Sequence, residues 1–439
     1  MARASDAPEN GPSASLFPLP ETRPQKSAQT AAPPAADVEA AADGAGERPP
    51  DLRTPIERFR RPPKKALSVT DIVSPAWCEL QYWYSLTKFG KVKRTPAMRQ
   101  GSKVHKELEE QVHTYVEIEV KTREDTFGLR IWNIIQGLRT IQATGLTREL
   151  EIWGVLDGEV INGVIDELSY ECPDPELEES IELSKLNRGA KLPPGQKTIS
   201  DFYASQQNPH SNWLGNPHPE RKIYVTDIKT RATKYMPQGA ALRGTQMQLM
   251  LYHKILTNLA SNLVPADTIF ERYKLDSRTP FTEQFIKNIA ALEDNFIHEN
   301  TVDDDEARFS NIDDQLSELS HHNSLTRLWS LMITEFQRTF PTPSSLSPIL
   351  QVEYRKGKDG KVMGNQCFVY DDVVLTRYVG KTMDWWMGRR EARGVDIEEA
   401  FKCQVCEFAP ECGWRKQKVE EGMKRFREKR KIGERKWQV

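Results

Sequence analysis

Two short stretches, GVIDEL at residues 163–168 and VTDIKT at residues 225–230, decide the fold that we predict for this chain. Each belongs to an apolar run with the length and residue types of a β-strand. Asp166 lies late in the first run. Asp227 and Lys229 are two positions apart in the second, so both project from the same face of a strand. If the two strands are neighbours, the two carboxylates and the lysine converge.

The sequence around these stretches alternates between helical and strand periodicity. Two strands, at 149–156 and 160–168, are joined by a turn near Asp157-Gly158. We predict an α/β fold in which helices flank a mixed sheet. Further strands are expected at 223–228, 348–355 and 365–370, and helices at 101–121, 126–143, 240–259, 282–298, 323–338 and 373–390.

The two ends of the chain differ in composition from its middle. Residues 1–66 are rich in Ala and Pro with few large apolar residues, which predicts a disordered tail, either plain or with a targeting role. One folded domain is expected at 67–416, with an irregular insertion at 172–220. A basic tail, 417–439, follows it. Residues 414–439 hold eleven basic and four acidic residues. We expect them to form either a helix or a disordered arm, which either binds phosphates or acts as a nuclear import signal.

Charge and hydropathy exclude two classes of protein. The 439 residues include 61 basic and 63 acidic ones, a net charge of −2, so a uniformly basic nucleic-acid coat is excluded. No apolar stretch approaches the roughly 20 residues of a membrane helix, so we expect no membrane association. Residues 81–106, with seven basic residues and no acid, suit a nucleic-acid strand or a solvated face over an aromatic cluster. The DNA-binding candidates are Lys88, Lys91, Lys93, Arg94 and Arg99.

The acidic residues of the two strands have the chemistry of a metal site. Asp166 and Asp227 offer hard oxygen ligands, which Mg²⁺ prefers. Lys229 can then orient or help to deprotonate a water and offset charge in a transition state. An Asp-x-Lys sequence on a strand is also common as a solvated charge pair, so the pattern alone leaves both interpretations open.

Two predicted helices carry further candidates. His105 lies four residues after Gly101 and four before Glu109 on one helix stripe, where it is either a further metal ligand or a partly exposed histidine. Gln248 and Tyr252, also four apart, form a polar patch on an otherwise apolar helix. They either contact substrate or belong to an ordinary amphipathic edge.

Four of the six cysteines form a metal-binding pattern. Cys403-x2-Cys406-x5-Cys412 needs a fourth ligand from elsewhere, for which Cys78 is the candidate. Three close thiolates plus one distant thiolate favour a [4Fe–4S] cluster over zinc, which usually takes two close pairs. Such a centre joins both ends of the folded region, so its binding free energy becomes folding free energy. Cys172 and Cys367 are interpreted as ordinary thiols.

Several motifs together resemble the exonuclease V family, in the RecB-like branch of the PD-(D/E)XK nucleases. The resemblance covers about residues 67–416 and includes SVTD at 68–71, WCELQ at 77–81, the Gly101-to-His105 spacing, both strand motifs, the Gln248–Tyr252 pair and the cysteine pattern. It implies a restriction-endonuclease-like core, Mg²⁺-dependent hydrolysis of single-stranded DNA and a structural [4Fe–4S] cluster. Relatives digest from 5′ ends, and some from either end, so the resemblance favours the 5′→3′ direction. Relatives often carry Glu where this chain has Asp227.

The resemblance also assigns roles to residues. Asp166 and Asp227 would bind the metal, Lys229 would be the catalytic lysine, and His105 matches the first nuclease motif. Gln248 and Tyr252 match the family's Q-x3-Y motif. Cys78, Cys403, Cys406 and Cys412 match the cluster ligands.

The sequence therefore predicts a monomeric single-strand-specific DNA exonuclease that acts in replication, repair or recombination. The long insertion and the N-terminal extension resemble fungal members, so we expect action on the mitochondrial genome, with the nucleus as the alternative location. Single-stranded DNA is the expected partner, and a single-strand-binding protein is a further candidate. The alternative function is a non-catalytic iron–sulfur protein that binds single-stranded DNA.

Overall fold

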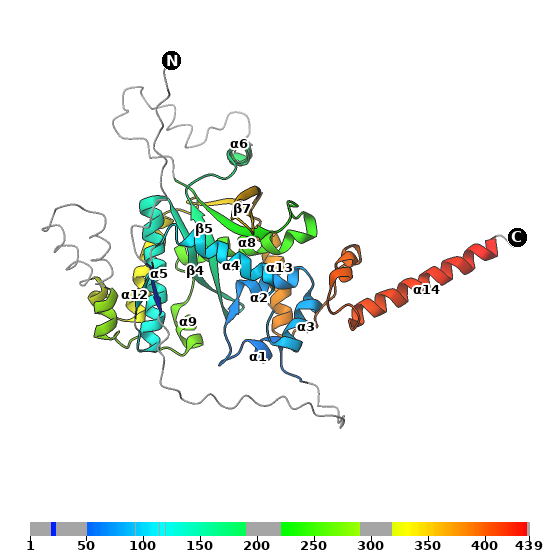
Figure 1. The fold of residues 1–439 in the computed structure, drawn as a ribbon, viewed down its shortest axis with the longest axis horizontal. Helices are drawn as coiled ribbons and strands as arrows, with labels where there is room; N and C mark the ends of the chain where they lie inside the picture. The colour runs from blue at the N-terminus through cyan, green and yellow to red at the C-terminus, as the bar shows by residue number, and fades with distance from the viewer. Residues whose placement is uncertain are drawn as a thin grey trace, which may run out of the picture.

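A six-stranded mixed sheet lies at the centre of the structure, which is a computed structural model (Figure 1). Each of the five strands predicted from the sequence falls on one of its strands. The six strands of the sheet are β2 (Leu67–Ser68), which was not predicted, β4 (Leu146–Leu156), β5 (Glu159–Ser169), β6 (Ile223–Arg231), β7 (Leu346–Lys356) and β8 (Val362–Val369). The structure describes residues 19–22, 51–92, 94–113, 115–118, 120–189, 221–289 and 318–436.

The strand order brings the two motif strands side by side, which is the condition under which their carboxylates and lysine converge. The order is β2-β5-β6-β7-β8, and β4 pairs with β5. β5 is antiparallel to β4 and β6, β6 is parallel to β7, and β7 is antiparallel to β8. Glu167 pairs with Thr226, so Asp166 and Asp227 are the next residues along two adjacent strands.

Helices cover the sheet and add the remaining layers (Figure 1). α8 packs across β4, β6 and β7, α5 packs on β4, and α12 packs on α5; α4 contacts β6 and β4. The helices are α1 (Pro55–Phe59), α2 (Val69–Val73), α3 (Glu79–Phe89), α4 (Pro96–Glu109), α5 (Arg123–Thr144), α6 (Pro175–Gly189), α8 (Arg243–Ala260), α9 (Ala266–Tyr273), α12 (Leu325–Thr339), α13 (Asp372–Trp386) and α14 (Gly413–Lys436). Short 3₁₀ helices are η1 (Ser74–Ala76), η2 (Gly239–Ala241) and η3 (Ile397–Val405).

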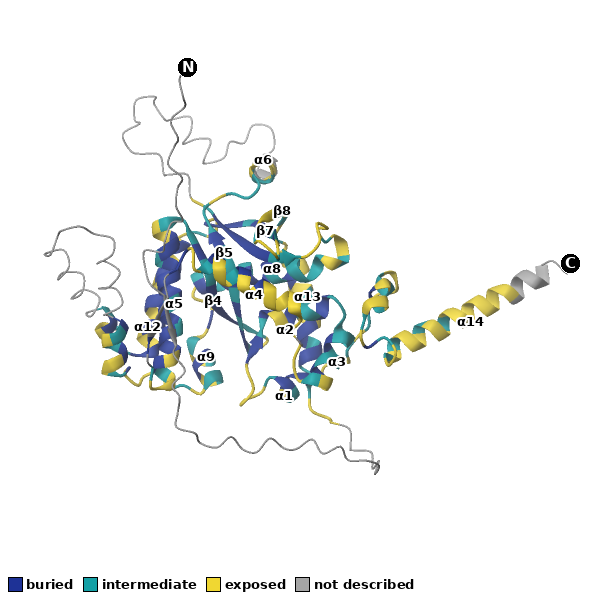
Figure 2. Cartoon of the chain, in the orientation of Figure 1, coloured by how far each residue is buried: buried dark blue, intermediate teal, exposed yellow. Residues whose placement is uncertain are grey.

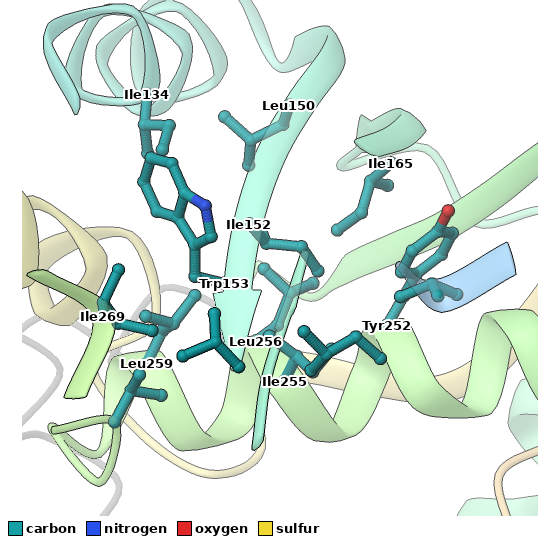
Figure 3. Packing of buried hydrophobic residues seen from close by; sticks show 14 of the residues in the cluster. Ile134, Leu150, Ile152, Trp153, Ile165, Tyr252, Ile255, Leu256, Leu259 and Ile269 are labelled. Atoms are coloured by element: carbon teal, nitrogen blue, oxygen red, sulfur yellow. The ribbon is translucent and has the colours of Figure 1, made fainter. Parts of the chain in front are cut away.

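The core between α8 and the sheet holds the site residues in place. Ile255, Leu256 and Leu259 of α8 point toward β4 and β5, and Trp153 of β4 fills the space toward α5 (Figure 3). All four are essentially buried. At about 25 cal/mol per Å² of apolar surface removed from water, each such side chain contributes roughly 1.5–3 kcal/mol. The apolar face of α8 therefore fixes its register on the sheet, and with it the positions of its polar residues.

The folded region begins earlier than predicted. Residues 51–66, expected within the disordered tail, include α1, whose N-cap Thr54 and Glu57 form a reciprocal capping box. Ile56 and Phe59 of α1 are buried in the main core. Packing stabilises this helix, which is too short to be recognised by its periodicity. The predicted start of the folded domain at Leu67 is therefore wrong by about a dozen residues.

Other expected boundaries also change. The insertion predicted to be irregular at 172–220 contains α6, and residues 190–220 lie outside the described residues. The helix expected at 101–121 is α4, which ends at Glu109. It is followed by β3 (Tyr115–Ile118), which pairs in parallel with β1 (Leu19–Thr22). The C-terminal basic segment is a helix, α14, which settles one of the two alternatives left open by the sequence.

No helix within the described part of the chain combines the length and the apolar character needed to cross a membrane.

Candidate active site

Three metal-ligating side chains meet on the α4 side of the sheet. Ligand atoms of His105, Glu149 and Asp166 all lie within 4.8 Å of one another. The Nδ1 atom of His105 is 3.1 Å from Oε1 of Glu149 and 3.8 Å from Oδ1 of Asp166. Its Nε2 atom is 3.0 Å from the carbonyl oxygen of Ile228. If Nε2–H donates to that carbonyl, Nδ1 is left facing the carboxylates, which is the usual way in which a histidine ligand is oriented.

A glycine one helical turn earlier explains how His105 reaches this position. A Cβ atom on Gly101 would lie 2.9 Å from Oγ1 of Thr230, which is too close for a real contact. Only glycine lets α4 approach the end of β6 so closely. The spacing of four residues then carries His105 onto the same stripe, above Asp166.

The two aspartates strain each other electrostatically. The side chain of Asp166 is 12% exposed, and its Oδ2 accepts a hydrogen bond from the backbone N–H of Ile228 at 2.7 Å. Burial and the neighbouring carboxylate of Asp227 raise the pKa of Asp166 to about 7. Asp227 is 1% exposed, and its Oδ2 has no hydrogen-bond partner. A cation held between the two carboxylates would offset their repulsion and give Oδ2 of Asp227 a partner, so this donor set fits a hard divalent metal.

Lys229 lies on the other side of Asp227. Its Nζ donates to Oδ1 of Asp227 at 2.8 Å and to Oε1 of Gln248 at 3.4 Å. Burial lowers the pKa of Lys229, but the carboxylates of Asp227 and Asp166 outweigh it, and the pKa is raised above the usual range. The ammonium is thus held beside the carboxylates by Asp227 and Gln248.

Gln248 and Tyr252 continue this polar chain on α8. Nε2 of Gln248 donates to the hydroxyl oxygen of Tyr252 at 3.1 Å. Burial and the nearby Asp166 raise the pKa of Tyr252, so its hydroxyl keeps its proton. Gly163 of β5 makes room for the ring, because a Cβ there would lie 2.7 Å from both Tyr252 and Val69. The structure therefore brings all six residues singled out by the sequence into one site.

Glu149 is the site residue that the sequence reasoning missed. It lies between the pairs Arg148–Glu167 and Leu150–Ile165, and so opposite Asp166. Its φ of 50° is in the left-handed region, which is rare for Glu and typical of strained functional positions. The sequence did contain a signal for this position, because an Asp157-Gly158 pair favours a two-residue hairpin turn. Both residues have a positive φ in the structure, and this turn fixes the register that places Glu149 opposite Asp166.

An open pocket leads to this site. It is lined by His105, Glu149 and Lys229 together with exposed cations from α4 and the segment before it. Of the five DNA-binding candidates, Arg94 lines the pocket, Lys91 and Arg99 are exposed but do not line it, and Lys93 lies outside the described residues. Lys88 lies further away, 3.4 Å from Glu411. The basic lining cations are Arg94, Lys106 and Lys229.

The four candidate cluster cysteines surround a second, apolar pocket. Cys78 is the N-cap residue of α3, Cys403 lies in η3, Cys406 follows η3 directly, and Cys412 directly precedes α14. Burial raises the pKa of the Cys78 thiol, and the nearby Cys406 and Cys403 raise it further. The structure therefore brings together two segments more than 300 residues apart, as the spacing predicted.

Within the described residues, no three cysteine thiols all lie within 4.8 Å of one another. The choice between a zinc ion and a [4Fe–4S] cluster therefore rests on the spacing of the cysteines in the sequence. Cys172 and Cys367 take no part in this pocket.

A buried lysine connects the two segments that line the cysteine pocket. The side chain of Lys402 is 1% exposed, and its Nζ donates to the carbonyl oxygen of Trp77 at 3.0 Å and to Glu399 at 2.7 Å. Nζ also lies 4.7 Å from the centre of the Trp77 ring. Because Trp77 precedes Cys78 and Lys402 precedes Cys403, one side chain positions both segments. Glu399 also pairs with Arg243, at the start of α8.

Comparison with known proteins identifies the class of enzyme. A family model described as "Exonuclease V - a 5' deoxyribonuclease" matches residues 54–415. The protein is therefore a hydrolase that degrades DNA, and the non-catalytic alternative loses its support. The chain belongs to the exonuclease V family.

Individual relatives agree with this assignment. Exonuclease V of Danio rerio is 24% identical over 371 residues, which cover 83% of this chain and 73% of the relative. A protein named "Exonuclease V, mitochondrial" from Candida glabrata is 24% identical over 423 residues, 82% of this chain and 81% of that protein. A protein of the same name from Eremothecium gossypii is 22% identical over 425 residues, 80% and 77% of the two chains.

Proposed function

We propose that this exonuclease hydrolyses single-stranded DNA with Mg²⁺, in the 5′→3′ direction, on a PD-(D/E)XK-type core. The observation that carries the proposal is the pair of adjacent carboxylates, Asp166 and Asp227, one with a raised pKa and one with an orphaned oxygen, beside Lys229. Acidic residues that burial keeps close together in this way are favoured only if a cation or a proton shares their charge.

Asp166 and Asp227 would hold the metal, with Glu149 and His105 as further ligands at its edge. When bound, Mg²⁺ supplies a Lewis acid for the phosphate and lowers the pKa of a bound water. Lys229 offsets the negative charge that develops on the phosphate oxygens. Gln248 holds the Lys229 ammonium in place, and Tyr252 supports Gln248 through its hydroxyl.

Single-strand preference and location are supported less directly. The pocket beside α4 combines exposed cations with a site set between a helix and the sheet, an arrangement in which a flexible strand reaches the carboxylates more easily than a duplex. Two relatives carry the word mitochondrial in their names, and we extend that location, and a role in replication, repair or recombination of the mitochondrial genome, to this protein.

We further propose that the four cysteines hold a structural [4Fe–4S] cluster. The four thiols line one pocket together with Lys402, and three close cysteines plus one distant cysteine favour a cluster over zinc. The group would join the start of α3 to the segment before α14 and stabilise the fold.

The decisive experiment uses Lys229→Ala, with Lys234→Ala, at an exposed lysine five residues on, as its matched control. Purified proteins receive single strands labelled at either end, with one end blocked, in Mg²⁺ or in EDTA. We expect digestion from free 5′ ends by the wild type and the control, and a loss of about 10²–10³-fold or more in Lys229→Ala. Full digestion by Lys229→Ala would overturn the mechanism, and digestion only from 3′ ends would overturn the direction.

A further inference from the structure

α14 takes no part in the site described above, although it is the longest helix among the described residues. Its 24 residues extend about 36 Å away from the domain at 1.5 Å per residue (Figure 1). Its described side chains are almost all exposed (Figure 2). Helices in proteins take most of their stability from packing on one face, so a helix this long that stands in water has a face available for a ligand.

The charge of α14 indicates a polyanion. The helix carries eleven basic residues against four acidic ones. One of the acids, Glu421, is neutralised within the helix by Lys418, whose Nζ is 2.9 Å away. The cations Lys424, Arg425, Arg427 and Lys429 follow in one exposed run. This excess of positive charge creates a local field that attracts phosphates, although the whole chain has a net charge of only −2.

The base of α14 adjoins the basic segment that leads into the active-site pocket. Nζ of Lys88, at the end of α3, lies 3.4 Å from Glu411 and 5.6 Å from the centre of the Phe408 ring. From Lys88 the chain runs through Lys91 to Arg94, which lines the pocket. The exposed cations therefore follow one path from the pocket, along the connection between α3 and α4, to the start of α14.

An anionic membrane is the competing occupant. Val419, Met423 and Phe426 are exposed at helical spacing, and a basic amphipathic helix with such a stripe can lie on lipid. The path of cations from the pocket favours a DNA strand instead, because only a strand would contact the pocket and the helix at once. Phe426, between two arginines, offers a ring on which a base can stack.

We propose that α14 is a second DNA-binding element, which holds the phosphates of the single strand outside the active-site pocket. This inference rests on the proposed function for the identity of the strand. Its consequence is that long strands bind more tightly than strands short enough to occupy only the pocket, and that the difference depends on salt.

The test replaces four cations of α14 by glutamine, Lys424→Gln, Arg425→Gln, Arg427→Gln and Lys429→Gln, in the full chain. The matched control makes the same change at four exposed cations near α9 and α12, on the far side of the molecule from α14 (Figure 1). Binding is measured by fluorescence anisotropy on short and long labelled single strands across a salt series, in the Lys229→Ala background to prevent digestion. The control positions are Lys274, Arg278, Lys287 and Arg327.

We expect the α14 variant to lose affinity for the long strand only, with the slope of log K against log salt smaller by up to about 3, since each phosphate contact on a single strand contributes about 0.7. In the active background, the same variant should cleave the short strand at the wild-type rate. An unchanged long-strand slope, or an equal loss in the control, would overturn the proposal. So would α14-dependent binding to phosphatidylserine vesicles without any change in DNA binding.

This design separates the two proposals. If the wild type fails to digest single strands, the proposed function fails, whereas the binding series still tests α14. If digestion proceeds and the α14 variant binds long strands as the wild type does, only the second DNA-binding element is wrong.

Discussion

The carboxylate site and the cysteine pocket are built in opposite ways. The first lies on two adjacent strands, where the backbone pairing itself brings Asp166 next to Asp227. The second joins Cys78 to Cys403, Cys406 and Cys412 through loops and helix ends, with Lys402 as a fastener. The repulsion between the two carboxylates destabilises the sheet. The sheet can hold them together because the packing of its apolar core stabilises the fold by more. The loops have no such support, so the proposed cluster should hold them together.

The comparison predicts that loss of a cysteine damages the fold, whereas loss of a carboxylate damages only the chemistry. We expect Cys406→Ser to lose its iron and visible absorption, and to lower the free energy of unfolding by several kcal/mol. Iron and sulfide assays and thermal unfolding monitored by circular dichroism measure this. Cys172→Ser, outside the pocket, is the control. A Cys406→Ser protein that unfolds at the wild-type temperature would contradict a structural role.

The carboxylate site should show the reverse behaviour. A folded pKa of about 7 for Asp166, against 3.8 when unfolded, means that the native state binds more protons between these values. Metal-free protein therefore loses up to about 4 kcal/mol of stability as the pH rises from about 4 to 7. Asp166→Asn should remove this loss and be more stable than the wild type at pH 7, although it is inactive.

The measurement is chemical unfolding in EDTA at several pH values, with Asp157→Asn, at the exposed turn of the same hairpin, as the control. If the difference between Asp166→Asn and the wild type does not grow with pH, the carboxylates do not strain each other. In a second measurement, we expect added Mg²⁺ to stabilise the wild type and to leave Asp166→Asn nearly unaffected.

A smaller effect on the free energy of unfolding is expected from replacing Lys402, which connects the two segments of the cysteine pocket. Lys402→Met keeps most of the volume and removes the hydrogen bond to Trp77, which leaves a buried carbonyl unsatisfied at a cost of about 1–3 kcal/mol. Lys418→Met, on the surface of α14, is the matched control. Unfolding measured in denaturant gives the difference, and equal stabilities of the two variants would show that Lys402 positions nothing.

An effect of similar size on stability is expected from a change in the packing behind the carboxylate site. Gly163→Ala places a methyl group 2.7 Å from Tyr252 and Val69, and overpacking of this kind costs about 1–3 kcal/mol. The displaced Tyr252 should also lower kcat more than it raises KM. Gly244→Ala in α8, whose new methyl would lie 3.8 Å from the nearest atom, should be neutral or slightly stabilising. Steady-state kinetics and unfolding of both variants test this contrast.

Much of the site could be predicted, because its motifs are local. Strands and helices of ordinary length reveal themselves by periodicity, and His105, Asp166, Asp227, Lys229, Gln248 and Tyr252 all fall on such elements. Glu149 was missed although both strands and the Asp157-Gly158 turn between them were predicted, because the hairpin register was not followed from the turn to the residue opposite Asp166. α1 was missed because five residues carry too little periodicity, and only burial of Ile56 and Phe59 reveals it.

The sequence by itself determined the class of fold, the spacing of the cysteines and the choice of Asp166, Asp227 and Lys229 as candidate site residues. Those features depend on strand alternation, helical turns and residue chemistry, which act over a few positions. Only the tertiary structure decided that Glu149 joins His105 and Asp166, that Lys402 spans the cysteine pocket, and that α14 stands free beside the basic path. These are contacts between segments far apart in the chain, and they depend on how buried faces pack rather than on any local pattern.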